Sequence, residues 1–342
     1  MRTDFGNTPQ RILVFVSADY ETQREVAADI RESLARTGGS DLDGDGLPDI
    51  EVVASRGRAH FYDELPRADV FFGWSIDEAK LEAAGNLMWI QLAGAGMEHV
   101  PLGEIARRGI VLTNAHGVHS VAVAEQALAL TLALARRLPL CLERQRERRY
   151  DRTGVGLEQL ELCGSRAAIL GFGSIGVEIG RRLAGFGVEV WAMVKVPRLV
   201  REATRVFGPG DWRELLAGVD VIFNCLPLTP ETENWLDAEK LGAIKKGALL
   251  VNVGRGGTLD EQALAAALES GRLGGAALDV TREEPLPGES PLWSAPGLIL
   301  TPHTASLTRR MYAKITGLFN DNLRRYLSGR ELVNLVKPER GY

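Results

Sequence analysis

The sequence predicts an α/β protein built from two doubly wound parallel sheets. Its 342 residues are enough for two domains of ordinary size. Short apolar runs alternate with stretches of helical spacing along most of the chain, which is the pattern of parallel strands joined by crossover helices. One apolar run leads directly into a glycine-rich loop that opens a helical stretch, a typical feature of such sheets.

The composition narrows the possible functions. Hydrophobic residues make up 45% of the chain and charged residues 25%, and the net charge of −5 argues against binding to nucleic acid or to an acidic membrane surface. The longest apolar run is interrupted by Glu125 and Gln126, and the N-terminal MRTDFGNTPQR has no apolar signal segment. Cys141, Cys163 and Cys225 are far apart and odd in number, so we expect a reducing, cytoplasmic location.

The first half of the chain predicts one α/β unit. A helical stretch over residues 21–38 carries Val26, Ile30 and Leu34 on one face and stops at Gly38. The predicted strands of this unit are 11–18, 50–55, 68–74, 88–93 and 109–114.

The second half predicts a fuller unit of the same kind. A long helix, rich in alanine and leucine, covers residues 120–138 and ends at Pro139. The mixed-charge segment LERQRERRYDR follows, and we interpret it as a solvated helix face. A last helix is expected over about 307–328. The predicted strands are 166–173, 188–194, 220–227, 248–254, 275–280 and 298–303.

The loop GFGSIG has the G-x-G-x-x-G spacing between a strand and a helix. Gly171 suits a tight turn, Gly173 lets the backbone approach a pyrophosphate, and Gly176 allows helix and strand to pack closely. Amide donors at the helix N-terminus favour an anion there. We therefore predict a Rossmann-type dinucleotide site, against the alternative of a tight turn without a ligand. The predicted contacts in this loop are Gly171, Phe172, Gly173, Ser174, Ile175 and Gly176.

The end of the next strand bears on the coenzyme. An acidic residue there would bind the ribose 2′-hydroxyl of NAD, but Val194 occupies the position and the nearby Glu189 lies early in the strand. Lys195 and Arg198 follow, with Arg201 close by, and cations attract a 2′-phosphate. We favour NADP over NAD, with the alternative that these cations are simply exposed.

Several later stretches resemble the D-isomer-specific 2-hydroxyacid dehydrogenase family. They are LLVNVGRGGTLDE (249–261), ALDVTREEPLPGESPLW (277–293) and LILTPHTA (298–305), together with the glycine loop and CLPLTPET (225–232). The resemblance extends upstream to WIQLAGAGMEHV (89–100) and RGIVLTN (108–114), so it covers about residues 68–305. It implies an NAD(P)-dependent oxidoreductase that reduces a small 2-oxo acid to a D-2-hydroxy acid by hydride transfer.

Three residues carry this chemistry, both by their own properties and by the resemblance. Arg255 can grip a carboxylate with two donors and polarise the adjacent carbonyl. A histidine titrates near neutral pH, so His303 can give a proton on reduction and take it back on oxidation. Glu284 would hold the other imidazole nitrogen and favour the imidazolium. Because each follows a predicted strand, all three are expected at one edge of the sheet.

The resemblance implies further contacts in both halves of the chain. Asp279 corresponds to a residue that orients the nicotinamide amide, and the segment with Pro227 and Thr232 to one that lies over the cofactor. Leu226, Val253 and Gly254 are expected beside it. The family binds the substrate carboxylate with backbone amides, which points to Ala93, Gly94, Ala95 and Gly96, where small residues allow a close approach. His60, His99, His116 and His119 do not match the family's histidine pattern.

Departures from relatives narrow the substrate. Formate-oxidising relatives carry glutamine where this chain has Glu284, and phosphite-oxidising relatives carry lysine where it has Ala95. Serine-pathway phosphoglycerate relatives often add a C-terminal regulatory domain that we do not expect here. Glyoxylate, hydroxypyruvate or a larger 2-oxo acid then remain, and the sequence does not decide among them.

The resemblance also implies the overall organisation. We expect a dinucleotide domain over 118–303 and a substrate domain formed by 1–117 plus 304–342, with the substrate in the cleft between them and hinge closure excluding water. A homodimer is expected, with the alanine-rich helix near the contact. The alternative from another functional class is a dinucleotide-sensing, corepressor-like protein with little turnover.

The segment SDLDGDGLPDIEVV places four aspartates, Asp41, Asp43, Asp45 and Asp49, in a D-x-D-x-D-G-x-x-D pattern. An EF-hand would need a glutamate at its twelfth position, where Val52 stands, so the pattern is closer to calcium loops of some β-propellers. We favour a solvated loop with Asp-Gly turns over a structural calcium site, and we predict no catalytic metal.

Overall fold

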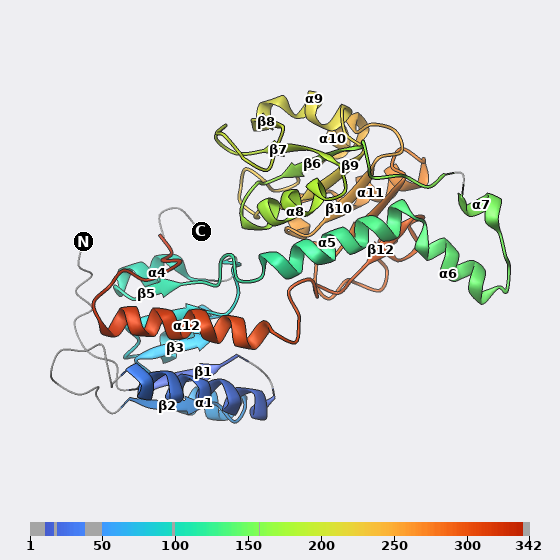
Figure 1. Cartoon of the computed structure of the whole chain (residues 1–342). Helices are drawn as coiled ribbons and strands as arrows, with labels where there is room; N and C mark the ends of the chain where they lie inside the picture. The colour runs from blue at the N-terminus through green and yellow to red at the C-terminus, as the bar shows by residue number, and fades with distance from the viewer. Residues whose placement is uncertain (1–10, 17–18, 38–49, 98–99, 157, 338–342) are drawn as a thin grey trace. The chain divides into compact units, whose positions relative to one another are not determined.

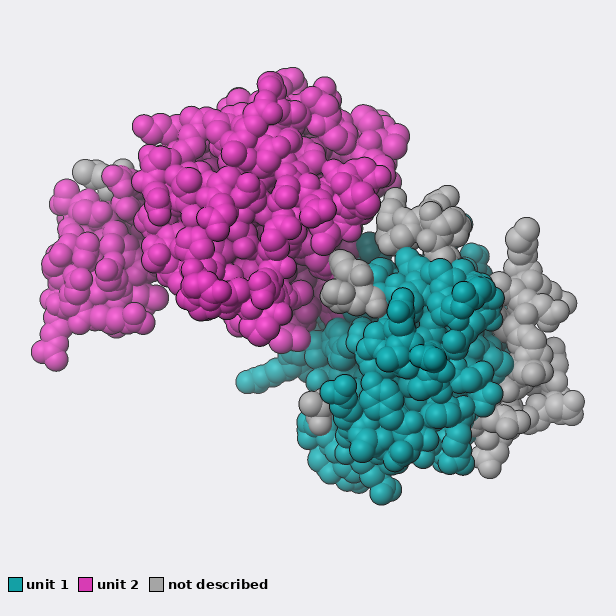
Figure 2. Space-filling model, turned by 180° about the vertical axis from the view of Figure 1, so that it is seen from behind, with its two compact units in different colours: residues 1–118, 308–342 teal, residues 119–307 magenta. Residues whose placement is uncertain are grey.

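The computed structural model describes residues 11–16, 19–37, 50–97, 100–156 and 158–337, and Figure 1 labels their helices and strands. They form two compact units, coloured separately in Figure 2. Unit 1 comprises residues 1–118 and 308–342, and unit 2 comprises residues 119–307. The assignment of substrate binding to the first and dinucleotide binding to the second stays a prediction.

Unit 1 is a five-stranded parallel sheet in the order β2-β1-β3-β4-β5, with helices on both faces. This order is that of flavodoxin-like doubly wound sheets. The five strands are β1 (Arg11–Phe15), β2 (Glu51–Ala54), β3 (Val70–Gly73), β4 (Trp89–Leu92) and β5 (Val111–Thr113). The helices are α1 (Tyr20–Thr37), α2 (Arg58–Glu64), α3 (Glu78–Ala83), α4 (Leu102–Arg107) and α12 (Met311–Leu327).

Alternation along the strands divides the core of unit 1 into two layers. Ile12 and Val14 of β1 pack in a cluster with residues of α1 and α12, whereas Leu13 packs on the other face with residues of α2, α3 and α4. Helices α1 and α12, at opposite ends of the sequence, lie side by side on one face of the sheet (Figure 1). The C-terminal helix is therefore part of the first unit.

Aromatic rings fix α12 on the sheet. Phe319 stacks on Phe72 and on Trp89, with ring centroids 4.5 and 5.1 Å apart, and Tyr326 stacks on Trp89 at 5.4 Å. The contacting residues Phe319 and Tyr326, with Ile315 and Leu323, recur at helical spacing, as an amphipathic helix requires. Such pairs add about 0.5–1.5 kcal/mol each beyond their burial.

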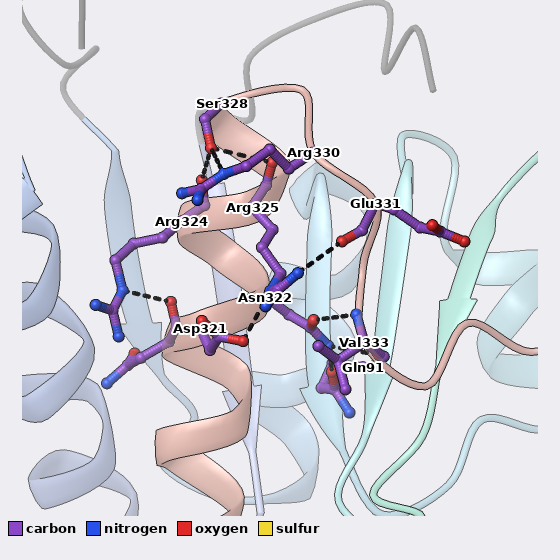
Figure 3. A network of polar contacts seen from close by, with 10 residues as sticks. Gln91, Asp321, Asn322, Arg324, Arg325, Ser328, Arg330, Glu331 and Val333 are labelled. Atoms are coloured by element: carbon purple, nitrogen blue, oxygen red, sulfur yellow. Dashed lines mark hydrogen bonds and ion pairs between the residues drawn. The ribbon is translucent and has the colours of Figure 1, made fainter. Parts of the chain in front are cut away.

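A buried polar network joins α12, β4 and the segment after α12 (Figure 3). Asn322 is fully buried, donates from Nδ2 to Gln91 Oε1 at 2.9 Å and to the Val333 carbonyl at 3.0 Å, and accepts from the Val333 amide at 2.7 Å. Gln91 Oε1 also accepts from the Thr113 hydroxyl. Farther on, Leu335 bridges Thr113 in antiparallel fashion, so the C-terminal segment extends the sheet edge at β5.

Unit 2 is a seven-stranded parallel sheet in the order β12-β11-β10-β9-β6-β7-β8. The reversal of strand order between β6 and β9 is the switch point of a Rossmann-type sheet. The strands are β6 (Arg166–Leu170), β7 (Glu189–Met193), β8 (Arg205–Phe207), β9 (Val221–Asn224), β10 (Leu249–Asn252), β11 (Gly275–Leu278) and β12 (Leu298–Leu300). The helices are α5 (Ser120–Ala135), α6 (Leu138–Arg146), α7 (Arg152–Gly156), α8 (Ser174–Ala184), α9 (Trp212–Ala217), α10 (Ala238–Ala243) and α11 (Glu261–Glu269). The predicted fold class, two parallel-sheet α/β domains, is confirmed.

Two details of the sequence prediction were wrong. The helix expected over 120–138 ends at Ala135, because Arg137 adopts a left-handed φ of 53°, and Pro139 lies in the first turn of α6 instead of ending a helix. Strand β8 was not predicted, since its three residues are too few to show a period. No helix in the described part of the chain is long and apolar enough to cross a membrane.

We predict that Asn322→Ala lowers the free energy of unfolding by roughly 2–4 kcal/mol, because Gln91 and Val333 lose buried hydrogen-bond partners. Urea denaturation followed by tryptophan fluorescence measures the change. The matched control is Asn86→Ala, since Asn86 is exposed and makes one side-chain bond, to the Pro66 carbonyl. A loss at Asn322 no larger than at Asn86 would contradict the role of the network.

Candidate active site

The predicted catalytic and dinucleotide residues of unit 2 lie in loops at one edge of its sheet. All strands of unit 2 are parallel, so the loops that follow them meet at the carboxyl edge. The glycine loop follows β6, Arg255 follows β10, Glu284 lies beyond β11 and His303 follows β12. This edge, at the switch point, is where open α/β sheets bind ligands.

The glycine loop has the close packing that its spacing predicts. Gly171 has a left-handed φ of 85°, and a Cβ there would lie 2.9 Å from the Cys225 carbonyl oxygen. A Cβ on Gly176 would lie 2.9 Å from the Gly171 oxygen, so α8 can approach the strand this closely only because residue 176 has no side chain.

The start of α8 leaves room for an anion. Gly173 is the N-cap residue, no side chain caps the helix there, and a Cβ on Gly173 would meet no atom within 4 Å. Open space in front of helix N–H groups is the cradle that a pyrophosphate requires, so these residues fit a dinucleotide.

The loop after β7 presents cations. Val194 is buried, whereas Lys195 and Arg198 are exposed. Glu189 lies at the opposite, amino end of β7, where the Trp191 indole donates to it at 2.7 Å and is the main cause that lowers its pKa. The Thr229 hydroxyl is the main cause that lowers the pKa of Glu231, and the charge of Lys195 contributes in the same direction.

His303 and Glu284 are in direct contact. His303 Nδ1 lies 2.7 Å from Glu284 Oε2, and the other carboxylate oxygen accepts the Thr281 amide at 3.1 Å. Both side chains are substantially exposed, at 48% and 38%, so the imidazole can be reached from solvent. His303 has a positive φ of 51°, an unusual conformation for a non-glycine residue at the turn that follows β12.

Asp279 anchors that turn. Its side chain is buried, and its two carboxylate oxygens accept from the Thr301 hydroxyl at 2.6 Å and from the amides of Thr304 and Ala305 at 3.1 and 3.0 Å. Its backbone carbonyl accepts the His303 amide at 2.8 Å. The structure therefore gives Asp279 a role in holding the histidine turn that the sequence did not reveal. Its expected contact with a nicotinamide amide stays a prediction.

Buried polar side chains hold the Arg255 turn. Asn252 Oδ1 accepts the Gly254 amide at 3.1 Å, and the Thr258 hydroxyl donates to the Arg255 carbonyl at 2.6 Å. Thr258 in turn accepts from Asn224 Nδ2 at 2.7 Å. Sequence reasoning missed Asn224, Asn252 and Thr258, although an asparagine that ends an otherwise apolar strand, as in VIFN and LLVN, was a visible signal.

The loop after β9 carries Leu226, Pro227 and Thr232. Leu226 is buried, and its amide donates to Asn224 Oδ1 at 3.3 Å. The Thr232 hydroxyl donates to the Pro227 carbonyl at 2.6 Å and so closes its own turn. Val253 and Gly254 are buried beside this loop, where a Cβ on Gly254 would lie 2.7 Å from the Leu226 oxygen.

In unit 1, residues Ala93–Gly96 follow β4. The Gly94 carbonyl accepts the Ala115 amide at 2.9 Å, and the Ala95 carbonyl accepts Asn114 Nδ2 at 3.3 Å. Because C=O and N–H of a trans peptide point in opposite directions, the amides of Ala95 and Gly96 are turned away from these partners. Sequence reasoning missed Asn114.

The described histidines among the other candidates are not in the loops that follow the strands of unit 2. His60 is on α2 and His116 follows β5, both in unit 1. Asp41, Asp43, Asp45 and Asp49, like His99, lie outside the described residues. Within the described ranges, no group of three or more histidine, cysteine or acidic side chains could hold a metal ion.

Known proteins are similar to the chain in sequence and in fold. A family model described as "D-isomer specific 2-hydroxyacid dehydrogenase, NAD binding domain" matches residues 128–305. The chain is 34% identical over 295 residues to glyoxylate/hydroxypyruvate reductase B of Yersinia enterocolitica, covering 85% of this chain and 90% of that protein. It is 32% identical over 299 residues to D-3-phosphoglycerate dehydrogenase of Archaeoglobus fulgidus, covering 85% of this chain but 56% of the relative, so it spans about half of that protein.

The chain is also similar in fold to a solved structure. It is that of the NADPH-dependent glyoxylate/hydroxypyruvate reductase from Sinorhizobium meliloti, in complex with NADP and malonate. The TM-score is 0.75 and the sequence identity 28%, over 97% of this chain and 98% of that one.

Proposed function

The chain belongs to the D-isomer specific 2-hydroxyacid dehydrogenase family, and on that premise we propose that it reduces a small 2-oxo acid to the D-2-hydroxy acid with a nicotinamide dinucleotide. The observation that carries the proposal is the 2.7 Å contact between His303 and Glu284, at the same sheet edge as Arg255 and the glycine loop. An acid, a cation and an anion cradle are the parts that this reaction needs.

In the proposed mechanism the three residues have different roles. The glycine loop and the start of α8 would hold a reduced nicotinamide dinucleotide, which would supply the hydride. Arg255 binds the substrate carboxylate and polarises the adjacent carbonyl. His303 donates a proton from Nε2 to the carbonyl oxygen, while Glu284 holds Nδ1 and stabilises the imidazolium before that transfer. The amides of Ala95 and Gly96 are proposed as further donors to the carboxylate.

We propose NADP(H) as the coenzyme. Lys195 and Arg198 follow the carboxyl end of β7. Glu189 lies at the amino end of the same strand, where it accepts a hydrogen bond from the Trp191 indole. The attraction between Glu231 and Lys195 would oppose a contact between Lys195 and a 2′-phosphate. Arg198 is then the stronger candidate for a 2′-phosphate contact.

The site and the relatives together support the proposed substrate class, a small 2-oxo acid. Glyoxylate, hydroxypyruvate and their larger analogues share the carboxylate and adjacent carbonyl that Arg255 and His303 would handle. The relatives include both glyoxylate/hydroxypyruvate reductases and phosphoglycerate dehydrogenases, so a phosphorylated acid belongs in the test. We further propose a cytoplasmic location, with which the three free cysteines agree.

The proposed function predicts turnover of a 2-oxo acid. Oxidation of NADPH and NADH, followed by absorbance, is measured against glyoxylate, hydroxypyruvate, pyruvate, a phosphorylated analogue and bulkier 2-oxo acids. We expect reduction with NADPH preferred, and the variant Lys195→Ala/Arg198→Ala should lose about tenfold in kcat/KM with NADPH but little with NADH.

The outcomes separate the parts of the proposal. Turnover that prefers NADH would keep the mechanism and contradict the role of the cations. Tight dinucleotide binding without turnover of any acid would contradict the enzyme and favour a dinucleotide sensor.

We also predict a homodimer. Helix α6 has no buried residue, exposes Leu138 and Leu142, and projects with α7 from the rest of unit 2 (Figure 1). Tyr150, between α6 and α7, is exposed as well. Covering such side chains with a second copy would remove apolar surface from water. Light scattering should give twice 37.2 kDa for the parent and a smaller mass for Leu142→Glu. A parent mass of 37.2 kDa would contradict the dimer.

A further inference from the structure

The turn that carries Arg255 and the loop that carries Glu284 touch through their backbones. A Cβ on Gly256 would lie 2.0 Å from the Thr281 carbonyl carbon and 2.4 Å from the Arg282 nitrogen. No side chain could be accommodated there, so the peptide after Arg255 is pressed against the peptide three residues before Glu284. The relative position of the two loops is therefore set where they meet.

Arg282 holds this contact from one side. Its guanidinium Nη2 donates to the Gly257 carbonyl at 3.1 Å and to the side-chain oxygen of Asn234, and its Nη1 lies 3.5 Å from the Glu233 carboxylate. A side chain from the Glu284 loop thus reaches the backbone of the Arg255 turn. Lysine has a single cationic nitrogen and could not reproduce this planar set of donors.

Glu261 holds the contact from the other side. It is the first residue of α11, which begins shortly after the Arg255 turn, and its Oε1 accepts the Arg282 amide at 2.6 Å. Burial raises the pKa of the Glu261 carboxyl, and the Arg282 amide opposes that rise, so the contact stabilises the charged form. The two contacts are reciprocal, since each side chain binds the backbone of the other segment.

We propose that Arg282 and Glu261 form a clamp of positioning residues that fixes the Glu284 loop against the Arg255 turn. The proposal rests on the proposed function, in which Arg255 binds the substrate and Glu284 holds His303. Displacing one loop by about 1 Å would misalign the Arg255 guanidinium, which binds the substrate carboxylate, with the proton donor His303. Such a misalignment can lower the rate by up to roughly 100-fold. The clamp would act through Arg255 and Glu284 without touching the substrate.

Kinetics of Arg282→Ala, Arg282→Lys and Glu261→Gln test the catalytic part. We expect Arg282→Ala to lower kcat by about 10- to 100-fold while the dissociation constant for NADPH stays within about twofold. Arg282→Lys should recover only part of the loss. Because both residues serve one contact, the double variant Arg282→Ala/Glu261→Gln should lose less than the product of the single losses. The matched control is Arg213→Ala, because Arg213 on α9 forms an exposed ion pair with Glu239 on α10, and this change should leave both constants unchanged.

Hydrogen exchange tests the clamp independently of turnover. In Arg282→Ala and in Glu261→Ala, a peptide covering residues 279–286 should exchange about tenfold faster or more than in the parent and in Arg213→Ala. Equal exchange in parent and variants would overturn the clamp, whatever acid the parent reduces. Unchanged kcat in Arg282→Ala, or a loss of NADPH binding equal to the loss of kcat, would overturn the positioning role. A parent that reduces no 2-oxo acid would overturn the proposed function, and exchange alone would then decide the clamp.

Discussion

The buried carboxylate of Asp279 is the contact on which the arrangement of the candidate active site depends. The Thr301 hydroxyl and the amides of Thr304 and Ala305 donate to its side chain, and the His303 amide donates to its backbone. A charge buried to this degree is tolerable only when it is fully hydrogen-bonded, so the turn after β12 must wrap around the end of β11. That wrapping gives His303 its left-handed backbone and places its ring beside Glu284.

The same principle recurs at the other turns of both units. Asn224, Asn252 and Thr258 are fully buried, and their side chains hold the turns that follow β9 and β10. In unit 1, Asn114 holds the carbonyl of Ala95, and Asn322 holds the C-terminal segment against β4. Asn224 and Asn252 end their strands and Asn114 follows β5, so these short polar side chains replace the ladder hydrogen bonds that stop there. The exposed chemical groups are therefore supported by buried, fully paired ones.

The sequence predicted the fold better than the contacts within the site. Apolar runs and the glycine spacing identified both sheets, because burial on two faces leaves a strong local pattern. The sequence did not predict strand β8, since three residues show no period. It also did not predict the break before α6, because the left-handed φ of Arg137 has no local sequence signature. The motifs indicated Arg255, Glu284 and His303. The anchoring role of Asp279 and the close backbone contact at Gly256 depend on contacts between distant segments. Such contacts have no periodic signal in the chain.

In the proposed reaction His303 moves a proton and does not merely stabilise the fold. The most direct measurement compares parent and His303→Ala for kcat, with the 2-oxo acid that the parent reduces fastest, and for NADPH affinity by fluorescence titration. We expect a loss on the order of 10²–10⁴ in kcat with NADPH binding nearly intact. A loss of binding equal to the loss of turnover, or a kcat within about threefold of the parent, would contradict it.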